Sequence, residues 1–132
     1  MNEIKKKTVK AENVIEYVIS NPVVAKKALP GQFIILIVEE GGERVPFTIT
    51  DYDREEGTIT LLVQTVGEST MRLSKLNEGD SLYAFVGPLG NPTDLKDYNK
   101  VCLVGGGIGT AVIYPQAKEL KRLGKQVDVI LG

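Results

Sequence analysis

The chain has 132 residues, with 16 Lys or Arg against 17 Asp or Glu and a net charge of −1. This is about one domain's worth of chain, and 42% hydrophobic with 25% charged residues is the composition of a globular protein. There is no His and one cysteine, Cys102. The sequence therefore excludes a Ser-His-Asp triad, an imidazole base, a His-ligated metal, an internal disulfide and an iron–sulfur cluster held by this chain alone.

The N-terminal ten residues hold four lysines but no apolar segment follows them, and the longest aliphatic run, residues 33–38, is six residues long. These features predict neither a signal peptide nor a membrane partner, and a single thiol suits a reducing cytoplasm. The near-neutral charge disfavours nucleic acid as a partner. We interpret Lys5 to Lys7 as a solvated strand end.

The first 86 residues alternate segments of strand character with turn signals about every ten residues. This rhythm predicts a small antiparallel barrel or sandwich. Gly41-Gly42 and residues 53–57 are predicted hairpin connections. The expected strands are residues 13–20, 32–39, 45–51, 58–64 and 81–86.

Residues 68–76 change period, because Met71, Leu73 and Leu76 do not alternate cleanly. We expect a helix of about two turns here, capped by Ser69 or Thr70, and a hydroxyl-rich helix start is a ready anion site.

A different pattern begins at Asn99. Residues 100–104 read as a buried strand, a glycine-rich loop follows, and a helix runs to Leu123 before a second strand at residues 127–131. This is a βαβ unit, the opening of a nucleotide-binding sheet, and we place the boundary within residues 88–99.

The glycine loop matches a dinucleotide-binding fingerprint only in part, because Thr110 stands where the third glycine is expected. From spacing alone, dinucleotide binding and a merely tight strand-to-helix turn are equally favoured. One βαβ unit cannot cover both faces of a parallel sheet. We therefore interpret the chain as a fragment of a longer protein, or as one that another copy or partner completes.

Four motifs occur together in a familiar order. They are residues 44–49 (Arg-Val-Pro-Phe-Thr-Ile), 67–70 (Gly-Glu-Ser-Thr), 87–91 (Gly-Pro-Leu-Gly-Asn) and the glycine loop. In this order the chain resembles the ferredoxin-NADP reductase superfamily. It is most similar to the branch with the electron-transfer subunit of dihydroorotate dehydrogenase and the flavin subunit of NADH-dependent ferredoxin:NADP oxidoreductase, also called sulfide dehydrogenase.

The resemblance implies a mainly β fold. A small antiparallel Greek-key FAD-binding barrel at residues 1–98 would precede the first βαβ unit of a truncated α/β NAD(P)-binding domain at residues 99–132. It implies FAD as cofactor, NAD(P)H as substrate, and a [2Fe-2S] cluster only in the full-length protein.

The resemblance also assigns roles to particular residues. The isoalloxazine and ribityl would lie along Val45, Pro46, Phe47 and Thr48, with Leu62, Val63 and Gln64 on the other side. The remaining assignments are Arg44, Gly67, Ser69 and Thr70 for the pyrophosphate, and Gly105, Gly106, Gly107, Ile108, Gly109 and Thr110 for the nicotinamide nucleotide.

The chain departs from the superfamily at three points. Phe47 and Thr48 stand three and four places after Arg44, one more than is usual, so the pyrophosphate role of Arg44 is open. Val112 replaces a frequent Pro after the glycine loop, and the cysteine cluster of the closest branch is absent.

The function implied is an electron-transfer flavoprotein subunit, a cytoplasmic oxidoreductase that takes a hydride from NAD(P)H and passes electrons to an iron–sulfur acceptor. Its partner would be a ferredoxin or a second redox subunit of dehydrogenase, glutamate synthase-like or hydrogenase type. No side chain needs to act as a catalytic acid or base, and this chain alone is expected to be inactive. The alternative is a non-catalytic β-barrel module that binds a ligand or partner.

Overall fold

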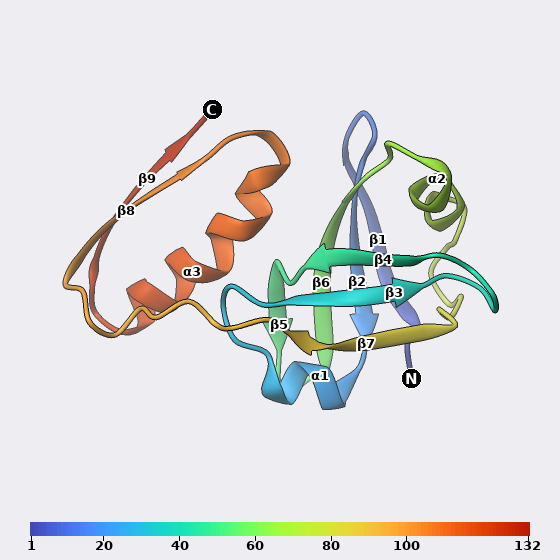
Figure 1. The fold of residues 1–132 in the computed structure, drawn as a ribbon, viewed down its shortest axis with the longest axis horizontal. Coiled ribbons are helices and arrows are strands. Elements are labelled where there is room, and N and C mark those ends of the chain that lie inside the picture. Colours follow the sequence, from blue (N-terminus) through green and yellow to red (C-terminus); the bar gives the residue numbers. More distant parts are fainter.

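The computed structural model describes all 132 residues and contains two antiparallel sheets, one parallel pair of strands and three α-helices (Figure 1). The first sheet has the strand order β1-β2-β6-β5 and the second has the order β4-β3-β7. Their bounds are β1 Ile4–Ala11, β2 Val14–Ser20, β3 Phe33–Ile37, β4 Arg44–Thr48, β5 Asp51–Asp53, β6 Thr58–Gln64 and β7 Ala84–Leu89. Strands make up 42% of the residues and helices 22%, so the predicted mainly β class is confirmed.

The strands of the second sheet run across those of the first in Figure 1, and one core lies between them. Alternate residues of β2 and β6 point into this core, including Tyr17, Ile59 and Leu61, all with no exposed surface. β3 contributes Ile34 and Leu36 from the other side. The period-two pattern that predicted these strands is therefore the pattern of their burial.

One predicted strand is two. Residues 45–51 divide into β4 and β5, which belong to different sheets. The switch falls between Ile49, whose N–H donates to the Gln32 carbonyl, and Thr50, whose N–H donates to the Thr60 carbonyl. The hydrogen-bond partner of the chain thus changes from the β3 side to β6 between two consecutive residues. This change does not alter the alternation of apolar and polar residues in the sequence.

The last barrel strand lies later in the chain than expected, at Ala84–Leu89 rather than residues 81–86. β1 was not predicted as a full strand. Its lysines sit on the outer edge of the first sheet, where Lys side chains are typical because they discourage further strand pairing.

Helix α1 (Pro22–Lys27) was also not predicted, although its signals are in the sequence. Asn21 accepts a hydrogen bond from the Val24 N–H at 3.1 Å, and Pro22 occupies the first helical position. The two predicted hairpin connections are confirmed: β3 pairs with β4 around Gly41, and β5 pairs with β6 around Gly57, each glycine with positive φ.

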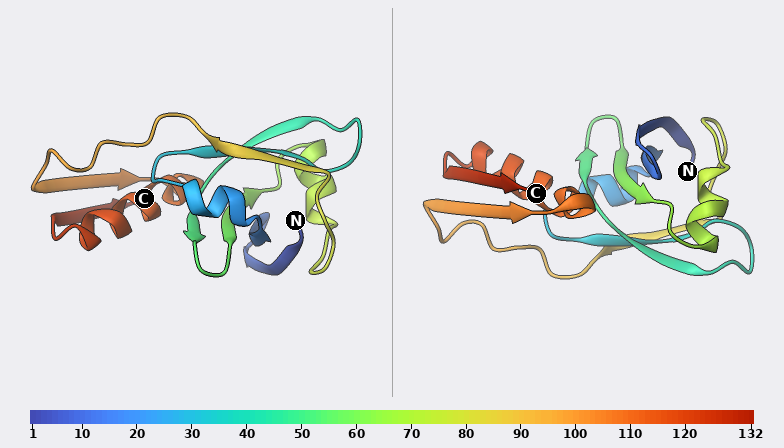
Figure 2. Two further views of the ribbon diagram at one scale, coloured as in Figure 1. Left: turned by 90° about the horizontal axis from the view of Figure 1, so that it is seen from below. Right: turned by 90° about the horizontal axis from the view of Figure 1, so that it is seen from above.

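The C-terminal part holds the predicted βαβ unit, with β8 at Lys100–Gly105, helix α3 at Thr110–Arg122 and β9 at Gln126–Leu131. β8 and β9 pair in parallel, which confirms the predicted unit. A separate small cluster of Leu95, Leu103 and Leu120 packs α3 on these strands. Figure 2 shows this unit extending from one end of the molecule, beyond the two antiparallel sheets. No helix is both long and apolar enough to cross a lipid bilayer.

Helix α2 (Glu68–Ser74) is fixed to the barrel by a buried tyrosine. The Tyr17 hydroxyl donates to the Leu73 carbonyl at 2.8 Å, and burial raises the pKa of Tyr17 to about 12. Because this pKa is higher in the folded than in the unfolded chain, the stabilisation is complete below about pH 10 and is lost as the pH rises towards 12.

We expect Tyr17→Phe to remove this part of the pH dependence while costing about 0.5–1.5 kcal/mol at neutral pH. Urea unfolding from pH 8 to pH 11 measures both effects. The difference in stability between wild type and variant should shrink as the pH rises; a difference that stays constant would show that Tyr17 does not titrate with folding.

Candidate functional site

The N-terminal end of α3 faces β4 across a cavity of about 500 Å³. On the barrel side the cavity is bounded by Pro46, Phe47 and Thr48, and on the helix side by Val112. Pro46 is exposed, while Phe47 and Thr48 are half-buried, with Phe47 also packed on the main core. The cavity offers flat apolar surface and one hydroxyl, as a ligand with a planar ring and a polar edge requires.

A second cavity of about 290 Å³ lies along the same seam between barrel and helix. It is bounded by Thr50, Thr60 and Leu62 on the barrel and by Thr110 and Tyr114 on the helix. The Thr50 side-chain oxygen is buried and has no hydrogen-bond partner. A buried unpaired hydroxyl costs about 1–3 kcal/mol, so either a ligand atom or an ordered water in this cavity would stabilise it.

The predicted pyrophosphate residues do not all remain free. Thr70 is buried, and its hydroxyl accepts from the N–H groups of Val66 and Gly67, each at 3.0 Å. The cap of α2 is Gly67, not Ser69 or Thr70 as expected, because Thr70 sits in the first turn and closes it from inside. The hydroxyl of Thr70 is thus engaged by the turn in this structure.

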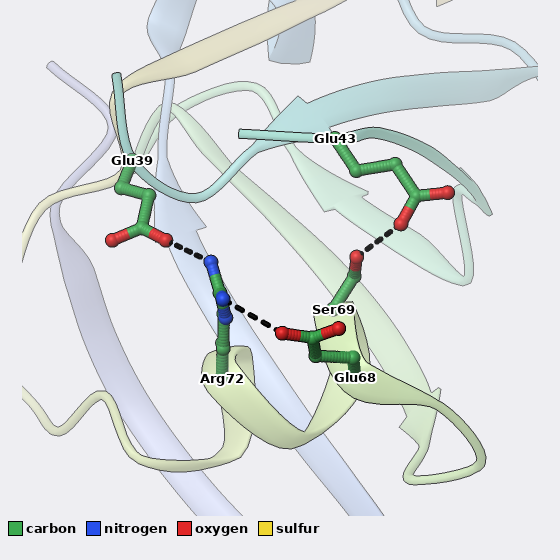
Figure 3. A network of polar contacts seen from close by, with 5 residues as sticks. All are labelled: Glu39, Glu43, Glu68, Ser69 and Arg72. Atoms are coloured by element: carbon green, nitrogen blue, oxygen red, sulfur yellow. Dashed lines mark hydrogen bonds and ion pairs between the residues drawn. The ribbon is translucent and has the colours of Figure 1, made fainter. Parts of the chain in front are cut away.

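Ser69 lies within a network of acidic residues that joins α2 to the β3–β4 connection (Figure 3). Its hydroxyl donates to Glu43, and Arg72 on the same helix contacts both Glu39 and Glu68. These two carboxylates raise the pKa of Arg72 above its ordinary value, Glu39 by the larger amount. Two carboxylates therefore flank the guanidinium, and a third holds the Ser69 hydroxyl, in the region where a pyrophosphate was predicted.

Arg44 stands apart from this network. It begins β4, on the edge of its sheet, and its side chain is exposed. None of the hydrogen bonds or ion pairs of the network involves it, which leaves the guanidinium able to bind an anion.

The three predicted flavin-contacting residues at the end of β6 differ in exposure. Leu62 is half-buried and faces the second cavity, Gln64 is exposed, and the Val63 side chain is fully buried in the core. Of the three residues predicted here, Val63 can therefore contact a ligand only through its backbone.

The glycine loop joins β8 to α3 through a short 3₁₀ turn at Gly107–Gly109. Gly107 has φ +54°, and a Cβ on Gly105 would lie 2.7 Å from Ile113, so a side chain at either position would disturb the loop. Gly106, Gly107 and Ile108 are exposed, and the Thr110 hydroxyl donates to the Gly107 carbonyl at 2.9 Å. The loop is compact, and much of its backbone lies at the surface.

Sequence reasoning missed the barrel residues Gly31, Thr50 and Asp51, and the helix residues Tyr114 and Lys118. Gly31 carries a signal that could have been read, because a Pro-Gly pair marks a turn, and the structure gives Gly31 a φ of +93°. The others meet only where α3 folds back onto β5, and no spacing within one element marks that encounter.

No family model matches the chain. Curated relatives do: the chain is 46% identical over its whole length to a dihydroorotate dehydrogenase B (NAD(+)), electron transfer subunit homolog from Thermotoga maritima, of which it covers 47%. It is 35% identical over 78% of its length to the corresponding electron transfer subunit of Fusobacterium nucleatum, of which it covers 42%. The chain thus spans about half the length of the curated relatives it matches.

Solved structures agree with the relatives. An NADH-dependent reduced ferredoxin-NADP oxidoreductase, studied for flavin-based electron bifurcation, superposes with a TM-score of 0.96 and 46% identity over the whole chain and 48% of its own length. Phthalate dioxygenase reductase shares the fold with a TM-score of 0.79 at 22% identity, over 98% of this chain and 41% of its own. The predicted resemblance is thereby confirmed: the chain has the ferredoxin reductase-like fold and is related to the dihydroorotate dehydrogenase B electron transfer subunits.

Proposed function

We propose that this chain holds FAD on its barrel and presents a nicotinamide nucleotide to it from the α3 side, as part of an electron-transfer oxidoreductase. The observation that carries the proposal is the seam between the barrel and α3, which holds an apolar cavity of about 500 Å³ beside β4 and a smaller one bordered by Thr50, whose hydroxyl is unpaired. The names of the relatives, electron transfer subunits and an NADH-dependent oxidoreductase, support the same class of reaction.

The residues present fit a flavin. Phe47, Pro46 and Val112 supply apolar surface for the ring, and Thr48 and Thr50 supply hydroxyls for its polar edge. Arg44 supplies a free cation for the pyrophosphate. When bound, such a flavin accepts a hydride and releases electrons singly.

The glycine loop is proposed to bind the nicotinamide nucleotide through the exposed backbone of Gly106, Gly107 and Ile108, at the start of the 13-residue helix α3. The same helix lines both seam cavities, through Val112 in one and Thr110 and Tyr114 in the other. The two ligands would therefore meet at the seam. We also propose that the barrel ends, and the nucleotide-binding part begins, near residue 98.

The electron acceptor is proposed to be an iron–sulfur protein, either a ferredoxin or a second redox subunit. The support is the kind of protein to which the chain is similar, an electron transfer subunit homolog and a reduced ferredoxin-NADP oxidoreductase. Dihydroorotate oxidation, sulfide or polysulfide reduction, hydrogenase coupling and transhydrogenation are all compatible with the site.

We expect Glu43→Gln to strengthen FAD binding about two- to fivefold, because it removes a negative charge from the predicted pyrophosphate region. The Ser69 hydroxyl, which now donates to Glu43, would also be freer to donate to a phosphate oxygen. Fluorescence titration with FAD measures the change.

Glu40→Gln is the matched control, since Glu40 lies in the same connection, is exposed, and has no part in the network of Figure 3. Riboflavin, which has no phosphate, should bind both variants as it binds wild type. An equal gain for riboflavin and FAD would place the pyrophosphate away from Glu43.

The experiment that tests the proposed function is anaerobic addition of NADH or NADPH to the FAD-loaded natural full-length protein, followed at the flavin absorbance. Bleaching supports the proposal. A protein that stays colourless after incubation with FAD favours the alternative, a barrel that binds another ligand or partner.

A further inference from the structure

The C-terminal unit is joined to the barrel by few interactions. Of the hydrogen bonds and ion pairs in the structure, one connects residues 1–90 with residues 100–132: Lys118 Nζ donates to Asp51 Oδ1 at 2.9 Å. Asp51 is the first residue of β5, and Lys118 lies on the side of α3 that faces it. The rest of the seam consists of side-chain contacts around cavities.

Four cavities lie along this seam, of about 500, 380, 350 and 290 Å³. Asp51 borders those of 380 and 290 Å³, and Lys118 borders the one of 380 Å³. Because these cavities open to solvent, few packed contacts between the barrel and α3 resist sliding or tilting of the C-terminal unit. The single ion pair therefore carries an unusual share of the orientation of α3.

The covalent connection between the two parts is also narrow. The N–H of Thr93 donates to the Pro30 carbonyl at 3.0 Å, and Thr93 packs against Gly31, so this residue belongs to the barrel. Two residues later, Leu95 is buried in the small cluster with Leu103 and Leu120, so it belongs to the C-terminal unit. The chain passes from one body to the other through Asp94, which is a place for a pivot.

We propose that Asp51 and Lys118 form a latch, a positioning pair that closes the C-terminal unit onto the barrel about a pivot at residues 93–95. The nine residues from Thr110 to Lys118 span about 12 Å of one continuous helix, so a shift at the latch is transmitted to the glycine loop. An effect of the latch on hydride transfer rests on the proposed function, whereas its effect on the position of α3 relative to the barrel does not.

The charge environment is consistent with a latch that can open. The bond to Asp51 is the largest cause that raises the pKa of Lys118, so the amine is charged at neutral pH. The side chains of Lys118 and Asp51 are 56% and 31% exposed, so water competes with the ion pair for both charged groups. Exposed pairs of this kind change an equilibrium by a factor of about two to five, enough to bias two arrangements without locking either.

The test measures distances between spin labels in the 132-residue chain, whose one native thiol is the exposed Cys102 of β8; the second label is on Val9→Cys of β1. Lys118→Glu replaces the ion pair by two like charges, so it should raise the population in which the C-terminal unit has separated from the barrel about two- to fivefold. The charge-swapped double variant Asp51→Lys with Lys118→Glu should restore the narrow wild-type distribution. Lys121→Glu, an exposed lysine on the same helix, should leave it unchanged.

An unchanged distribution in Lys118→Glu, or a double variant no closer to wild type than the single one, would overturn the latch. A second readout, in the FAD-loaded natural full-length protein, separates the latch from the proposed function: the rate at which NAD(P)H bleaches bound flavin should fall about two- to fivefold in Lys118→Glu and not in Lys121→Glu. A wild type that binds no flavin refutes the proposed function and leaves the distance result standing. Altered distances with an unaltered bleaching rate refute the role in hydride transfer.

Discussion

Leu61→Ala is expected to lower the free energy of unfolding by about 2–5 kcal/mol, because it empties space that surrounding residues fill only in part. Leu61 lies on β6, has no exposed surface, and belongs to the core shared by both antiparallel sheets. β6 is held between β2 and β5 by backbone hydrogen bonds, so it cannot shift freely to close the gap. Urea or thermal unfolding followed by circular dichroism measures the loss.

Val9→Ala provides the control within another strand, since Val9 is 70% exposed on β1 and its truncation should cost no more than about 0.5 kcal/mol. Equal losses at the two positions would mean that the sheets do not share a single packed core.

Arg44→Ala is expected to weaken FAD binding about ten- to a hundredfold, the loss of one charge-assisted bond of roughly 1.5–3 kcal/mol. Since Arg44 is exposed, folding stability should stay within about 0.5 kcal/mol of wild type. Flavin fluorescence titrations with FAD, FMN and riboflavin measure the effect, and riboflavin, which lacks phosphate, is the internal control.

The ranking of the three ligands decides where Arg44 acts. A loss confined to FAD, or to FAD and FMN, places its guanidinium at the phosphates. An equal loss for all three, or for none, would remove Arg44 from the pyrophosphate, as its one-residue displacement from the usual position of the superfamily allows.

The barrel strands were predictable from the sequence because each strand buries one face. Apolar residues therefore recur at every second position, as at Tyr17 and Ile19 and at Ile59 and Leu61. β1 was harder to see, since it is an edge strand rich in lysine. The break at Ile49–Thr50 was invisible because it depends on which neighbour each N–H finds, a property of the assembled sheets.

The candidate site follows the same rule. Residues that lie together on β4 or in the glycine loop were found by local motifs. The seam was not, because Asp51 and Lys118 are 67 positions apart and interact only when α3 rests on β5. The acidic network around Ser69 was missed for a related reason: Glu39 and Glu43 belong to one element and Arg72 to another (Figure 3).

The most direct test of the flavin site exploits the absence of Trp from the chain. Val112→Trp would place a single indole at the cavity shared with Phe47 and Thr48, where a bound flavin ring would contact it. Val9→Trp would place one on β1, at the opposite edge of the first sheet from β5. Titration with FAD should quench the first indole strongly and saturably, and the second much less. Equal quenching of the two, or none at Val112→Trp while flavin binds, would contradict a flavin site between β4 and α3.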